Sequence, residues 1–259
     1  MIRFAGWLSA FFLSSGIAAA EIPLNERRTG YELLGPTTRA MQDDDTSNPG
    51  MLWVLDGEAL WARKAGGAGR SCADCHGDAA ASMKGVAARY PAFGASAGRP
   101  IDIEQRINQC RVERQEAPAL ARESRELLAL TAFVARQSRG LPIEDTVAKD
   151  ERLKPFLEAG RALFEHRQGQ LNLSCGQCHD DLWDKKLAGN TITQAHPTGY
   201  PQYRLEWQTV GSLQRRLRNC LIGLRAETWA YGAPEYIDLG LYLMWRARGL
   251  PIEAPAVRP

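Results

Sequence analysis

The chain contains the hexapeptide Ser71-Cys72-Ala73-Asp74-Cys75-His76 and repeats its pattern 103 residues later as Ser174-Cys175-Gly176-Gln177-Cys178-His179. In a Cys-x-x-Cys-His motif the two thiols can add to the vinyl groups of a haem, and the histidine can bind the iron as an axial ligand. The sequence therefore predicts two covalently bound haem c groups. The residues predicted to hold them are Cys72, Cys75 and His76 in the first motif and Cys175, Cys178 and His179 in the second.

Two other uses of paired cysteines agree less well with the sequence. A four-cysteine zinc site would have to combine both pairs, but their offset of 103 residues is far beyond that of a zinc ribbon. A thioredoxin-like dithiol is expected near a βαβ pattern, and neither half of the chain shows a long alternating strand pattern. Haem attachment is the favoured interpretation.

The repeat extends well beyond the cysteine motifs. Five segments return in the same order: 57–61 as 160–164, 71–76 as 174–179, 90–91 as 200–201, 106–110 as 216–220, and 139–144 as 248–253. The offset is 103 at the cysteine pairs and 110 at the later cysteines, which indicates a net insertion of seven residues between His179 and Tyr200. We interpret the chain as a tandem duplication.

Each half has the pattern of a helical domain. Residues 126–139 form an amphipathic run followed by Gly140 and Pro142, a helix stop that Gly249 and Pro251 repeat. The predicted fold class is therefore mainly α, with two tandem cytochrome c-like haem domains related by internal duplication and an extended N-terminal arm. The predicted boundaries are 1–20 for a signal peptide, 21–50 for the arm, 51–147 for the first haem domain and 148–259 for the second, which would carry the active site.

Residues 1–20 have the features of a secretory signal peptide. Arg3 precedes an uncharged, mostly apolar run over 4–20, which ends in three alanines before Glu21. A retained membrane anchor is the alternative, but this run is shorter than the roughly 20 residues needed to span a bilayer. We expect a mature chain exported to the periplasm, with no membrane span after removal of the signal peptide.

The overall composition excludes some classes of partner. The 32 Lys and Arg residues nearly balance the 30 Asp and Glu residues, so the formal net charge is only +2. A general nucleic-acid-binding protein would need a basic excess to neutralise phosphates, and we expect no nucleic-acid partner. The proportions of 44% hydrophobic and 24% charged residues are typical of a globular protein.

Cys110 and Cys220 are the two cysteines outside the haem motifs, and each ends an Arg-x-x-x-Cys pattern. A second axial ligand to a haem iron is usually His, Met or Cys, unless the site is open. His166 and His196 have no counterparts in the first half, so the repeat favours the two cysteines as axial ligands. A disulfide between them is the alternative expected of an exported protein. Equivalent positions of tandem domains should, however, face separate haems.

Arg106 and Arg216 each precede their cysteine by four residues, which on a helix places them on the same face as the sulfur. Arg106 is interpreted as the partner of a haem propionate or a nearby carboxylate. Arg215 and Arg218 flank Arg216, whereas the first half has arginine only at the middle one of these three positions. We predict that the three charges favour a small dianion and keep the sulfur ionised. A purely solvated charged face is the alternative.

These features together resemble the SoxA family, the dihaem subunits of the SoxAX cytochromes of bacterial sulfur oxidation. The most specific element is the segment 216–220 after the second haem motif. The resemblance implies the activity of an L-cysteine S-thiosulfotransferase, which joins thiosulfate oxidatively to a cysteine of the carrier protein SoxYZ and releases two electrons. It also implies a heterodimer with SoxX, a small monohaem cytochrome c.

The resemblance assigns a role to each site residue. His76 and Cys110 would ligate the iron of the first haem, and His179 and Cys220 that of the second. Cys220 would be the active-site cysteine, found as a persulfide, and Arg216 would bind thiosulfate. A non-catalytic dihaem electron-transfer cytochrome is the main alternative. A dihaem peroxidase fits less well, because it needs an open axial site and the two cysteines would fill both.

Overall fold

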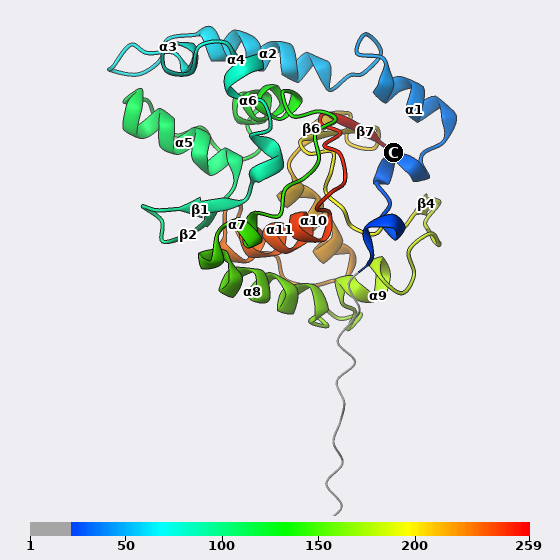
Figure 1. Cartoon of the computed structure of the whole chain (residues 1–259). Coiled ribbons are helices and arrows are strands. Elements are labelled where there is room, and N and C mark those ends of the chain that lie inside the picture. The colour runs from blue at the N-terminus through cyan, green and yellow to red at the C-terminus, as the bar shows by residue number, and fades with distance from the viewer. Residues whose placement is uncertain (1–21) are drawn as a thin grey trace, which may run out of the picture.

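The computed structural model describes residues 22–259, so the predicted signal peptide lies outside the described part of the chain. The described residues fold into two halves, each built on one pair of packed helices (Figure 1). These pairs are α2 (Met51–Ala62) with α6 (Arg125–Arg136) and α8 (Lys154–Glu165) with α11 (Pro234–Arg246). Within residues 22–259 no strand is longer than three residues, and the predicted mainly α class is confirmed.

A repeated glycine lies where the two helices of each pair come closest. A Cβ atom on Gly57 of α2 would lie 2.2 Å from the carbonyl oxygen of Ala129 on α6. A Cβ atom on Gly160 of α8 would lie 2.0 Å from the carbonyl oxygen of Asp238 on α11. Interiors are close-packed and leave no room for such an atom, so only glycine allows these helices to approach so closely.

In both halves a haem-motif helix, a hairpin and a longer helix follow one another in the same order, and each half has further elements of its own. The first half contains α3 (Cys72–His76), α4 (Ala79–Ser82), η3 (Ala87–Arg89), β1 (Ala92–Gly94), β2 (Arg99–Ile101) and α5 (Ile103–Arg114). The second contains α7 (Thr146–Lys149), η4 (Glu151–Leu153), α9 (Cys175–His179), β3 (Lys186–Leu187), β4 (Asn190–Thr191), β5 (Gln202–Arg204), β6 (Thr209–Gly211), α10 (Leu213–Gly223) and β7 (Ala256–Arg258).

The strand registers support the duplication. In the antiparallel hairpin β1–β2 Ala92 pairs with Ile101, and in β5–β6 Gln202 pairs with Gly211, at the same offset of 110 residues. The small hairpin β3–β4 occupies the region of the predicted insertion. The third strand β7 pairs with β5 in parallel, so the second half has a three-stranded sheet in the order β6-β5-β7.

Each half places its hairpin on the helices of the other half. Arg99 of β2 forms an ion pair at 2.9 Å with Asp238 of α11. Reciprocally, Tyr203 of β5 packs against Trp53 of α2, with ring centroids 6.1 Å apart. Figure 1 shows β1 and β2 beside α8, and β6 and β7 beside α6. The halves are therefore related by an approximate two-fold arrangement.

The repeated Gly-Leu-Pro-Ile-Glu segments meet at the centre of this arrangement. The backbone N–H of Ile143 donates to the carbonyl of Leu250 at 2.8 Å, and that of Ile252 donates to the carbonyl of Leu141 at 2.9 Å. Apolar side chains of both segments share one buried cluster. The motif that ends each repeat is thus also the contact between the repeats.

The N-terminal arm runs along the outside of the second half before it reaches α2 (Figure 1). It contains two 3-10 turns, η1 (Leu24–Glu26) and η2 (Gly30–Leu33), and the short helix α1 (Pro36–Asp43). Gln42 at the end of α1 accepts a hydrogen bond from the backbone N–H of Val257 in β7 at 3.1 Å. From residue 22 onward, none of the helices has the length and apolar character needed to cross a membrane.

Candidate functional site

Helices α3 and α9 begin with the same capping arrangement. Ser71 accepts a hydrogen bond from the backbone of Asp74 at 3.0 Å, and the Asp74 carboxylate accepts one from the backbone of Ser71 at 2.8 Å. Ser174 and Gln177 make the same pair of contacts at 3.2 and 2.9 Å. A capping box of this kind holds the start of a single helical turn, so both thiols of a motif lie on one side of it.

In the second half four predicted residues come together. Cys220 of α10 lies beside His179 of α9 and close to the thiols of Cys175 and Cys178. The Nδ1 atom of His179 donates to the carbonyl oxygen of Thr193 at 2.6 Å. This contact leaves Nε2 as the nitrogen available to a metal, as is usual for iron-bound histidines.

In the first half Cys110 of α5 lies near both thiols of α3, those of Cys72 and Cys75. The ring of His76 lies against that of Trp61 with centroids 5.6 Å apart. His76 and Cys75 are exposed, whereas both counterparts in the second half are partly buried. The first cluster is therefore the more open of the two.

The electrostatic surroundings of the two repeated cysteines differ. Burial raises the pKa of Cys110, and the charge of Arg106 offsets this effect only in part. Burial also disfavours the thiolate of Cys220. There the hydrogen bond with His179 and the positive charge of Arg216 outweigh it, so the pKa of Cys220 lies below its usual value. The second half favours an anionic sulfur.

The structure bears on two alternatives for the cysteines. All six are free, so no disulfide joins Cys110 to Cys220. The two Cys-x-x-Cys pairs lie at opposite ends of the molecule, on α3 and α9, so they do not form one four-cysteine site (Figure 1). Two thiols on one turn, an adjacent imidazole and a third sulfur near by form a donor set that fits a haem c in each half.

Only one arginine of the predicted cluster on α10 lies beside the cysteine of that helix. Arg216 is partly buried there, and its charge interacts with that sulfur. Arg215 instead packs on the ring of Trp207 at 4.4 Å, and Arg218 on the ring of Tyr231 at 4.8 Å. Neighbouring aromatic rings therefore hold the side chains of these two arginines, whereas Arg216 lies at the sulfur.

Comparison with known proteins matches both halves of the chain to one family. The family model described as SoxA/TsdA, cytochrome c domain, matches residues 56–143 and 159–252, and each match contains one haem motif. The L-cysteine S-thiosulfotransferase subunit SoxA of Pseudaminobacter salicylatoxidans is 39% identical over 236 residues, which cover 91% of this chain and 82% of the relative. The chain belongs to the SoxA family. The SoxA subunit of Rhodovulum sulfidophilum is 37% identical, over 90% of this chain and 81% of its own.

The fold agrees with that of a solved SoxA structure. The crystal structure of SoxXA from P. pantotrophus superimposes with a TM-score of 0.85 at 30% identity, covering 90% of this chain and 87% of that one. The match confirms two cytochrome c domains in tandem, and haem c is the cofactor that such domains carry. The resemblance inferred from the sequence is confirmed.

Two residues near Cys220 were not identified from the SoxA-like sequence motifs. Tyr200 lies close to Arg216, and burial raises the pKa of its hydroxyl to about 12. Tyr200 belongs to the repeated Tyr-Pro dipeptide that the sequence shows, but that pattern does not predict that its side chain lies near Arg216. Arg204 comes from β5 and also acts on the charge of Cys220. No local motif marks Arg204, because it reaches the site only through the fold.

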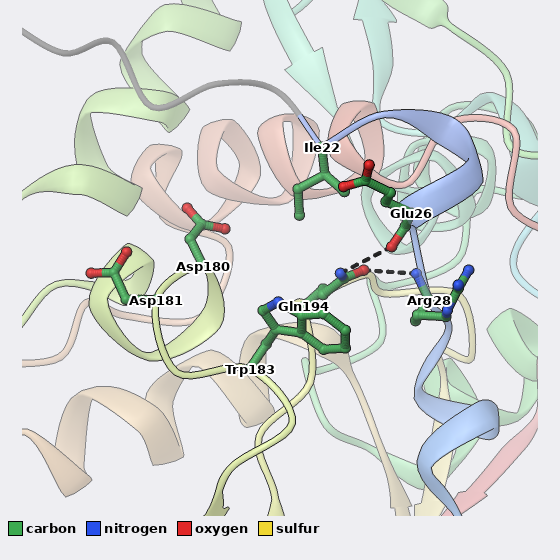
Figure 2. A pocket seen from close by; sticks show the side chains of 7 residues that line it. All are labelled: Ile22, Glu26, Arg28, Asp180, Asp181, Trp183 and Gln194. Carbon is green, nitrogen blue, oxygen red and sulfur yellow. Dashed lines mark hydrogen bonds between the residues drawn. The ribbon is translucent and has the colours of Figure 1, made fainter.

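A pocket of about 390 Å³ lies between the arm and the end of α9 (Figure 2). Its lining residues are Ile22, Glu26, Arg28, Asp180, Asp181, Trp183 and Gln194. The amide of Gln194 accepts a hydrogen bond from the backbone N–H of Arg28 at 2.7 Å and donates to the carbonyl of Glu26 at 3.2 Å. Gln194 follows Thr193, whose carbonyl orients His179, so the arm supports the loop behind the candidate haem ligand.

Proposed function

We propose that this SoxA-family chain binds two covalent haem c groups and joins thiosulfate oxidatively to a cysteine of a SoxYZ-type carrier protein. In the balanced reaction a carrier thiolate and the thiosulfate dianion form a carrier S–S–SO₃⁻ adduct and release two electrons. One new S–S bond forms and no bond within thiosulfate breaks. The shared name of the relatives, L-cysteine S-thiosulfotransferase subunit SoxA, supports this activity.

The arrangement of Arg216 and Cys220 carries the proposal. They lie one helical turn apart on α10, in a partly buried site where His179 approaches the sulfur. Arg216 binds the sulfonate group of thiosulfate by paired, charge-assisted hydrogen bonds. Cys220 is the active-site cysteine, and an extra sulfur on it, a persulfide, offers a reactive outer atom. The haem, when bound, accepts the electrons.

The remaining residues serve the cofactors. Cys72 and Cys75 attach the first haem, and Cys175 and Cys178 attach the second. His76 and Cys110 are the axial pair of the first iron, and His179 and Cys220 are that of the second. The convergence of these residues in two separate clusters supports the assignment.

A partner and a location complete the proposal. Electrons leave to a SoxX-type monohaem cytochrome c bound as a heterodimer, which agrees with the solved SoxXA structure of a relative. The complex works in the periplasm, which agrees with the signal-peptide features of residues 1–20.

Thiosulfate-dependent haem reduction, measured with and without carrier protein, tests the activity. Wild type should reduce its haem and form the carrier adduct, and Cys220→Ala should abolish adduct formation while the first haem remains attached. If Cys220→Ala only shifts a haem potential, the chain is an electron relay. The intact mass of the purified protein reports the number of haems, cleavage of the signal peptide and any extra sulfur on cysteine.

A further inference from the structure

Arg204 is a buried arginine whose guanidinium lies over the ring of Trp207 at 5.2 Å. The residue is 7% exposed, and its Nε atom is buried without a hydrogen-bond partner within residues 22–259. The carboxylate of Glu206 lies 3.1 Å from this nitrogen but is 44% exposed and not aligned for a hydrogen bond. Buried polar groups are almost always hydrogen-bonded, so an unpartnered guanidinium nitrogen indicates a place for an acceptor.

Arg204 lies beside a second arginine of the site. Burial and the like charge of Arg216 both lower the pKa of Arg204, so the two guanidinium groups repel each other. Tyr200 lies next to both, and burial keeps its hydroxyl protonated, as a hydrogen-bond donor. Arg204 and Arg216 thus place two positive charges near Cys220, and Tyr200 adds a neutral hydrogen-bond donor. The exposed carboxylate of Glu206 offsets only part of this charge, so a bound dianion would neutralise the site.

The first half provides an internal comparison. There Arg106 donates from Nε to the hydroxyl of Tyr90 at 3.3 Å, and in the second half Tyr200 likewise lies near Arg216. A role that both haems require is expected of residues that both halves share. Arg204 has Gly94 as its counterpart, at the same register position of the hairpin. The second half therefore has a buried positive charge at a position where the first half has none.

We propose that Arg204 is a specificity-determining residue of the Cys220 site, which together with Arg216 selects a doubly charged sulfur oxyanion over a singly charged one. This inference rests on the proposed function, since it names a second residue that recognises the thiosulfate of that reaction. Each guanidinium presents a fork that matches two oxygens of a sulfonate group. The guanidinium of Arg204 therefore adds a contact and a positive charge that stabilise a bound dianion more than a bound monoanion.

Equilibrium binding to the holoprotein, measured by calorimetry, tests the inference. The probes are thiosulfate and methanethiosulfonate, which keeps the sulfur–sulfur unit but carries one negative charge. We expect Arg204→Gln to weaken thiosulfate binding about 10- to 100-fold and methanethiosulfonate binding less than about 3-fold. Arg218→Gln removes the same charge from a side chain held on Tyr231 and should change neither affinity appreciably.

A second variant keeps the test informative if Arg204→Gln folds poorly. Glu206→Gln removes the exposed carboxylate and should strengthen thiosulfate binding several-fold, with haem content and both reduction potentials unchanged. Equal weakening of both anions by Arg204→Gln, an unchanged thiosulfate affinity, or a shift of the second haem potential alone would overturn the inference. If wild type binds thiosulfate but forms no carrier adduct, the proposed function fails instead.

Discussion

Arg106 and Arg216 are equivalent residues with different surroundings. Arg106 donates to Tyr90 at 3.3 Å and to the amide oxygen of Gln109 at 2.7 Å, so its side chain is used within the first half. Arg216 has Cys220 as a neighbour, and the sulfur raises the pKa of this guanidinium although burial opposes that effect. A difference in partners, rather than in residue type, separates a structural arginine from a candidate substrate-binding one.

Replacement of Arg216 should therefore damage catalysis selectively. We expect Arg216→Ala to lower kcat/KM for thiosulfate by about 30- to 1,000-fold, or roughly 2–4 kcal/mol of transition-state stabilisation. Arg216→Lys should recover little, because an ammonium keeps the charge but not the fork. Arg106→Ala should cost much less. Steady-state kinetics, with haem content checked, measures this difference. Comparable losses of kcat/KM at both positions would contradict the assignment of the active site to the second half.

His196 should make the stability of the fold dependent on pH. It is 8% exposed, its Nδ1 donates to the carbonyl of Arg28 at 2.8 Å, and burial lowers its pKa to about 4. The unfolded chain, with a pKa near 6.5, binds the proton first. The stability due to neutral His196 is thus fully present above about pH 6.5 and is lost as the pH falls towards 4, by up to about 3 kcal/mol.

Urea unfolding of wild type and His196→Asn between pH 7.5 and 4 measures this dependence. Asparagine keeps a donor towards Arg28 but does not titrate in this range. The variant should therefore lose less stability on acidification than wild type. Parallel pH profiles of the two proteins would show that another group is responsible.

At the level of elements, the helix pairs α2–α6 and α8–α11 depend on their glycines. Gly57→Ala and Gly160→Ala place a Cβ against a backbone carbonyl that cannot move without its helix. We expect each to lower the free energy of unfolding by about 1–3 kcal/mol despite the better helix propensity of alanine. A Cβ atom on Gly223 in α10 would meet nothing within 4 Å beyond its own stretch of helix, so Gly223→Ala should be neutral or stabilising in the same denaturation experiment.

The arm should act on the second haem site through one side chain. Gln194→Ala removes the two hydrogen bonds that this side chain forms with the arm, next to the residue whose carbonyl orients His179 (Figure 2). We expect a loss of about 1–3 kcal/mol in stability and a shifted reduction potential of the second haem only. Gln137→Ala is the matched control, since that amide bonds the Phe133 carbonyl of its own helix. Spectroelectrochemistry that finds both potentials unchanged would contradict the role of the arm.

For the whole molecule, the exchanged hairpins predict that the two halves unfold together. Arg99 reaches Asp238 from one half to the other, and the pair is only partly exposed. Arg99→Gln should lower the stability of both halves by about 1–3 kcal/mol, because one half cannot lose its packing surface without the other. Unfolding followed at the absorption of each haem should give coincident transitions in wild type and variant. Two separate transitions would mean that the halves are independent.

Local patterns account for what the sequence predicted correctly. Cys-x-x-Cys-His is a chemical signature within five residues of chain, and the duplication is visible because five landmarks keep their order. The helix over 126–139 followed from its apolar spacing, and it is observed as α6. Arg216 and Cys220 could be paired in advance because four residues on a helix make one turn. Each of these inferences needs only neighbours along the chain.

The sequence alone thus determined that the chain is a duplicated, mainly α cytochrome, and it named Arg216 and Cys220 on α10 as a candidate site. Tertiary structure alone decided which other side chains complete that site. Arg204 of β5 lies near Cys220, whereas Arg215 packs on the ring of Trp207. It also decided that each half covers the other with its hairpin. The physical reason is that burial, charge and ring contacts depend on residues far apart in the chain, whose meeting no local spacing encodes.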